Sequence, residues 1–135
     1  MSSKRRPRLV TSLSLGVLTF SAIHVAGLWA GINLPDLPLT VPRSYLLIKN
    51  GFWAVIGVFA AIALFTGRQW AIRFTRWSAV LFGIWYWIDR VFIMHSDFTR
   101  RSWPMAAIVT GAILVVLFGI TSRVSVRNYY LESKA

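Results

Sequence analysis

Apolar residues in this chain gather into long runs that are separated by short, mostly basic segments. The runs cover residues 9–29, 51–66, 77–95 and 102–122, and each is close to the roughly 20 residues that a membrane-spanning helix needs. A helix on the surface of a soluble core would carry one polar face, and these runs show none. The pattern therefore indicates transmembrane helices.

We expect helices over about residues 9–30, 44–66, 75–95 and 103–122, within a single membrane domain of residues 1–135. The predicted fold class is all-α: an integral membrane protein built as an antiparallel bundle of four transmembrane helices. The composition agrees, because 56% of the residues are hydrophobic and the mean hydropathy is +0.60. Both values are high for a soluble globular domain.

The formal net charge of +11 is unevenly distributed along the chain. Ten basic residues lie before the first run, between the second and third, and after the fourth, whereas the two other connections hold four. This alternation follows the positive-inside rule and predicts that both termini are cytoplasmic. We expect a protein of the bacterial cytoplasmic membrane, with no nucleic-acid partner.

Arginines on the cytoplasmic side of such a bundle are well placed to bind anionic lipid headgroups. The residues expected to do so are Arg5, Arg6, Arg68, Arg73, Arg76, Arg123 and Arg127.

The third run is the only one with full charges well inside it, at Asp89 and Arg90. A helix that enters the membrane near Trp77 places Asp89 about 18 Å into a hydrocarbon core of about 30 Å. Arg90 can extend its long side chain toward the headgroups. The shorter Asp89 needs a partner, water or a proton, because an unpaired charge is costly in an apolar medium.

Polar residues of three predicted helices fall near the same depth in the outer half of the bundle. These residues are His24, Lys49, Asn50, Asp89 and Arg90. Ionisable groups inside membrane segments usually face the interior and pair with one another. Three interpretations are open for this polar layer. Asp89 could pair with the neighbourhood of Arg90, with Lys49 or with His24 and so fix helix packing, the layer could be a proton relay or small-ligand site, or it could form an ion pair with another subunit.

Three consecutive aromatic residues, Trp85, Tyr86 and Trp87, lie about one turn before Asp89. Consecutive helical residues point in different directions, so some of these rings face lipid or another protein. The cluster is a candidate contact surface, and a quinone or pigment could stack there. A haem held by His24 and His95 would require both histidines at the same height.

No cofactor and no metal site is predicted, since the chain has no cysteine and its predicted spans contain no glutamate. No catalytic constellation is visible either, so an enzyme is not expected. The first functional hypothesis is an accessory or structural subunit of a larger membrane assembly, in contact with lipids and with other transmembrane subunits or further copies of itself. The alternative is a small oligomeric proton-coupled transporter or channel that uses Asp89 and His24.

Overall fold

The computed structural model describes residues 7–33, 41–93 and 97–132, and these residues form helices and no β-strand. The elements are α1 (Arg8–Asn33), α2 (Arg43–Phe65), α3 (Ala71–Ile88), the π-helical turn η1 (Asp89–Ile93), α4 (Asp97–Arg101), α5 (Trp103–Ser122) and α6 (Val124–Glu132). The prediction of an all-helical chain is thus confirmed for the described residues.

Three helices of the described chain, α1, α2 and α5, are long and apolar enough to cross a membrane. Helix α3 is not among them, because Arg73 and Arg76 occupy its first turns and tryptophan and tyrosine make up much of its last. Three of the four predicted spans therefore correspond to helices that are long and apolar enough to cross a membrane. The remaining one, α3 with η1, is less apolar.

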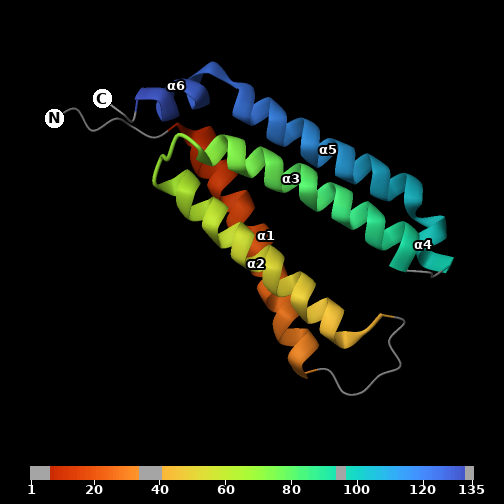
Figure 1. Ribbon diagram of the computed structural model, residues 1–135. Helices are drawn as coiled ribbons and strands as arrows, with labels where there is room; N and C mark the ends of the chain where they lie inside the picture. The colour runs from red at the N-terminus through yellow and green to blue at the C-terminus, as the bar shows by residue number, and fades with distance from the viewer. Residues whose placement is uncertain (1–6, 34–40, 94–96, 133–135) are drawn as a thin grey trace.

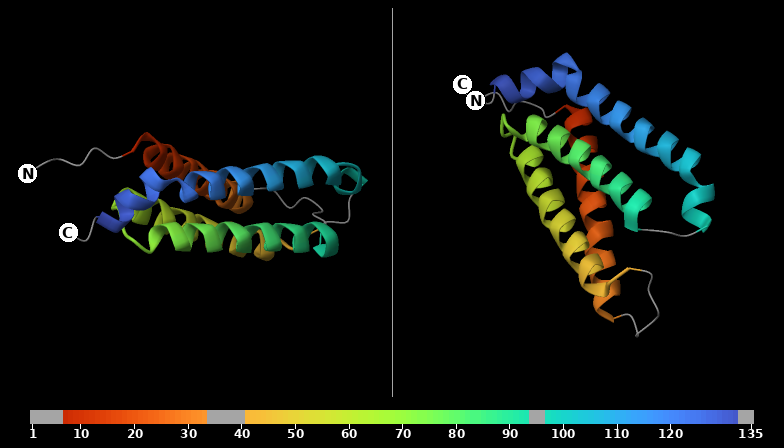
Figure 2. Two further views of the ribbon diagram at one scale, coloured as in Figure 1. Left: turned by 90° about the horizontal axis from the view of Figure 1, so that it is seen from above. Right: turned by 45° about the vertical axis from the view of Figure 1, so that its right-hand side comes forward.

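The long helices spread like a fan from one end of the molecule, called the narrow end below, where α1 and α3 begin and α6 lies (Figures 1 and 2). Helices α1 and α2 form one antiparallel hairpin. Helix α3 runs back from the α2–α3 turn, and α5 returns beside it. The hairpin of α1 and α2 diverges from α3 and α5 toward the opposite end.

Helices α1 and α2 pack closely because small residues lie where they meet. A β-carbon added to Gly57 would lie 2.8 Å from Cβ of Ser21, and one added to Gly31 would lie 2.9 Å from a methyl group of Leu47. The Ser21 hydroxyl also donates a hydrogen bond to the carbonyl oxygen of Ala54 (2.8 Å). Such close approach of backbones is the usual basis of helix association in membranes.

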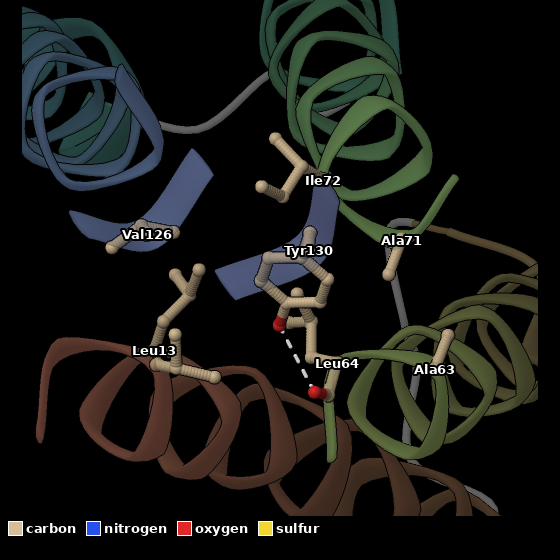
Figure 3. Packing of buried hydrophobic residues seen from close by; sticks show 8 residues of the cluster. Leu13, Ala63, Leu64, Ala71, Ile72, Val126 and Tyr130 are labelled. Atoms are coloured by element: carbon tan, nitrogen blue, oxygen red, sulfur yellow. Dashed lines mark hydrogen bonds between the residues drawn. The ribbon is translucent and has the colours of Figure 1, made fainter. Parts of the chain in front are cut away.

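At the narrow end, α6 folds back over the ends of α1, α2 and α3 (Figure 3). Tyr130 and Val126 are buried there against Leu13 and Leu64, and the Tyr130 hydroxyl donates to the Leu64 carbonyl oxygen (3.0 Å). The α2–α3 turn passes through Gly67, whose φ of 70° is the left-handed conformation that glycine adopts without strain. This cluster joins the two helix pairs.

Candidate functional site

The carboxylate of Asp89 is buried between α2 and α3, where it has two partners. Lys49 forms an ion pair with one carboxylate oxygen, and the hydroxyl of Tyr45 donates a hydrogen bond to the other. The indole Nε1 of Trp85 in turn donates to the Tyr45 hydroxyl oxygen (2.9 Å). These four side chains, Tyr45, Lys49, Trp85 and Asp89, are called the Asp89 cluster below.

Regular helical spacing brings the cluster together. Tyr45 and Lys49 are four residues apart on α2, and Trp85 and Asp89 are four residues apart along α3 and the start of η1. Residues at this spacing lie above one another on one helix face. Two such rows, one on each helix, therefore meet at matching positions.

Tyr45 was not among the predicted site residues, although its spacing from Lys49 was a usable signal. A hydroxyl one helical turn from a lysine lies on the same helix face, so it can reach the same partner.

The helix predicted over about residues 75–95 changes its geometry within the described residues. The α-helical geometry ends at Ile88, and Asp89–Ile93 forms a π-helical turn. The Asp89 backbone N–H bonds to the carbonyl oxygens of Trp85 and Tyr86. Turns of this kind are rare and are frequent at functional sites.

His24 and Asn50 form a second, separate contact between α1 and α2. The His24 Nδ1 donates to the Asn50 side-chain oxygen (2.9 Å), and the His24 ring packs edge-on against Phe20 and Phe82. Lys49 and Asn50 are neighbours in sequence, so their side chains leave α2 about 100° apart. Lys49 consequently meets α3 while Asn50 meets α1, and the expected layer is divided between two interfaces.

Arg90 is directed away from Asp89. Its guanidinium donates to the hydroxyl oxygens of Tyr86 (3.1 Å) and Ser102 (2.6 Å) and to the carbonyl oxygen of Thr99 (2.8 Å). It also lies over the ring of Tyr86, 5.9 Å from the ring centre. Arg90 thus ties η1 to the segment that leads into α5.

The three consecutive aromatic residues have different surroundings. Trp85 packs against Phe52 and Trp53 of α2, with ring centres 5.6 and 5.8 Å apart. Tyr86 stacks on Phe82 (6.4 Å), and Trp87 is half-buried beside Tyr86. The Trp85 part of the predicted contact surface is therefore occupied by rings of α2 from the same chain.

The arginines expected to bind headgroups also differ from one another. Arg76 donates to the side-chain oxygens of Thr121 (2.7 Å) and Ser122 (2.9 Å), so it holds α3 to the end of α5. The others within the described residues are exposed, namely Arg68, Arg73, Arg123 and Arg127. Arg5, Arg6 and His95, the second histidine of the considered haem pair, lie outside the described residues.

Chemically, the Asp89 cluster is a buried carboxylate with a cation and a phenol as its partners. This arrangement balances charge within an apolar surrounding and fixes the rotation of α3 against α2. Comparison of the chain with protein-family models, with curated proteins and with solved structures gave no match.

Proposed function

We propose that the chain crosses the bacterial cytoplasmic membrane four times, with both termini on the cytoplasmic side. Helices α1, α2 and α5 have the required length and apolarity. The 18 residues of α3 rise about 27 Å, close to the thickness of the hydrocarbon core, and η1 lengthens the segment further. The alternating distribution of basic residues supports the orientation.

The Asp89 cluster supports a membrane-spanning role for α3. A charged residue in a spanning segment is costly when it is alone, and Lys49 with Tyr45 provides Asp89 with an opposite charge and a donor. In this arrangement the exposed arginines Arg68 and Arg73 lie beside the narrow end, where anionic headgroups would neutralise them.

Within that membrane, the chain acts as an accessory or structural subunit of a larger assembly. The observation that carries this proposal is the exposure of α5. Within the 18-residue apolar stretch of α5, only 6% is buried within the chain, compared with 28% for α1 and 33% for α2. Thr121 is the single buried residue of α5. A helix with so few internal contacts is suited to pack against transmembrane helices of other subunits or of a second copy.

Native sizing tests this role. The tagged chain is extracted from its own membranes in a gentle detergent, and its mass and companions are measured by native mass spectrometry. We expect a complex larger than one chain. Val115→Trp on the exposed face of α5 should dissociate it, whereas Val55→Trp, at an equally exposed position on α2, should not. An unaltered chain that is stable as a monomer would contradict the proposal.

The buried carboxylate also favours a second candidate, a proton-coupled transporter or channel. Asp89 is buried and bonded to titratable side chains, as proton carriers in membrane proteins often are. In reconstituted vesicles with an imposed pH gradient, Asp89→Asn should then abolish proton flux while the helical circular dichroism stays unchanged. Equal flux in both proteins, or none in the unaltered chain, would remove this candidate.

A further inference from the structure

Four arginines lie at the narrow end, on the first turns of α3 and around the junction of α5 with α6: Arg73, Arg76, Arg123 and Arg127. They are called the basic cluster below. Arg76 joins the two groups, because its guanidinium donates to the side chains of the two residues that directly precede Arg123. Arg73 lies three residues before Arg76, and Arg127 lies four residues after Arg123. Each pair is therefore about one helical turn apart.

Helix α6 lies along the start of α3, so the two pairs of arginines belong to neighbouring helices. Ile72 of α3 packs with Val126 and Tyr130 of α6 in the buried cluster of Figure 3. Farther along, the Gln69 side chain donates to the Leu131 carbonyl oxygen (3.3 Å). These contacts and those of Arg76 fix α6 against α3 at both ends of the basic cluster.

The positive charge of the basic cluster is not balanced within these segments. Arg73, Arg123 and Arg127 are exposed, and in the part of the chain that the structure describes they have no ion pair or side-chain hydrogen bond. No acidic residue occurs between residues 37 and 88 or between residues 98 and 131. An anion from outside the chain would therefore meet four cations with little competition.

The two helices also begin here without an anion. Neither α3 nor α6 has an acidic residue in its first turn, and Arg73 and Arg127 are the third and fourth residues of their helices. The start of a helix carries a partial positive charge that favours anions, so an arginine there adds to an unbalanced charge. Each arginine pair thus lies beside a helix start that also favours an anion.

The surroundings of the basic cluster are apolar. Trp77 follows Arg76 directly and is 74% exposed, and Val124 follows Arg123 directly and is 64% exposed. Tryptophan and arginine side by side are typical of the boundary between acyl chains and headgroups. This combination favours an anion that carries acyl chains over a soluble one.

We propose that the basic cluster binds an anionic phospholipid with two phosphodiester groups, a diphosphatidylglycerol. One phosphate lies at each arginine pair, where the planar guanidinium groups match its oxygens. Basic surfaces between membrane helices on the cytoplasmic side are suited to such headgroups. The inference rests on the proposed topology, which places the narrow end at the cytoplasmic headgroups.

The test uses the full chain in micelles of an uncharged detergent. Native mass spectrometry measures its binding of diphosphatidylglycerol and of phosphatidylglycerol, which has one phosphodiester, at equal phosphate concentration. We expect one molecule of the two-phosphate lipid to bind at least about tenfold more tightly, since it reaches both arginine pairs. Equal affinity for the two lipids would overturn the proposal.

Two double variants of equal net charge locate the binding. Arg73→Gln with Arg127→Gln removes one cation from each pair, so the affinity for diphosphatidylglycerol should fall about 25-fold, or about fivefold for each arginine. Arg100→Gln with Arg101→Gln is the matched control, because these exposed arginines lie on α4 at the opposite end of the molecule. Its affinity should stay unchanged, and equal losses in both variants would overturn the proposal.

Circular dichroism verifies that each variant is folded, and Arg123→Gln replaces the first double variant if that one does not fold. Incorporation of the chain into lipid nanodiscs separates this inference from the proposed topology. A chain that inserts but does not prefer diphosphatidylglycerol overturns the lipid site alone. A chain that does not insert contradicts both. A glutamate-rich peptide that displaced the lipid at equal charge would indicate a surface for acidic proteins and would also overturn the lipid site.

Discussion

Helix α2 contacts α1 and α3 along its length, and it contacts them in different ways. Toward α1 the residues of α2 are small: Gly57 lies directly against Ser21, and the backbones approach closely. Toward α3 the side chains are long. Lys49 and Tyr45 reach across to Asp89 at one end, and Phe52, Trp53 and Phe59 contact aromatic rings of α3 farther along.

In the proposed membrane setting, the difference follows from the solvent. Lipid tails are as apolar as the helices themselves, so burial of apolar surface contributes little to helix association in a membrane. Close packing of small residues and interhelical polar contacts remain as the favourable terms. The α1–α2 interface uses mainly the first. The α2–α3 interface combines the second, at Lys49 and Tyr45, with contacts between large aromatic rings.

The largest effect is expected when the charge at the α2–α3 interface is left unbalanced. Lys49→Met keeps most of the side-chain volume but removes the cation beside buried Asp89. The free energy of unfolding should fall by about 3 to 5 kcal/mol, the cost of breaking a buried ion pair from one side. Reversible unfolding in mixed micelles, followed by circular dichroism, measures this change.

A double variant separates the charge from the packing. In Lys49→Met with Asp89→Asn, no charge remains, so most of the lost stability should return. A loss below about 1 kcal/mol in the single variant would mean that Asp89 is neutral or hydrated and that the ion pair does not hold α3.

The all-helical chain and its three long apolar helices were visible in the sequence, because a helix that can cross a membrane must be long and apolar. The turn at Gly67 was equally predictable, since few other residues adopt its conformation easily. The rotation of each helix was not. In lipid every face is apolar, so the hydrophobic pattern could not tell that Lys49 meets α3 while Asn50 meets α1.

Two parts of the site depend on the rotation of the helices. Tyr45 belongs to the Asp89 cluster because it shares a helix face with Lys49. Arg90 does not belong to it, because its side chain extends toward Ser102. The π-helical turn at Asp89 follows from hydrogen bonding between successive turns, which composition does not reveal. The cleft of about 690 Å³ among α1, α2, α3 and α5 depends on how far the two helix pairs diverge, which no single stretch of sequence determines.

An intermediate effect is expected when the α1–α2 interface is overpacked. The β-carbon of Gly57→Ala would lie 2.8 Å from Cβ and 3.2 Å from Cα of Ser21, and neither atom can move without shifting α1. The free energy of unfolding should fall by about 1 to 3 kcal/mol. Gly111→Ala, which meets open space on α5, should lose nothing. Equal stability of the two variants would show that the backbones do not approach closely.

The smallest effect asks whether shape or hydrogen bonding holds α1 to α2. Ser21→Ala retains the β-carbon that contacts Gly57 and removes only the hydroxyl that donates to Ala54. The Ala54 carbonyl oxygen keeps its helical partner, so the loss should be about 0.6 kcal/mol, the average for polar contacts between membrane helices. A loss as large as that of Gly57→Ala would make hydrogen bonding the main term at both faces of α2, and the contrast between its two interfaces would disappear.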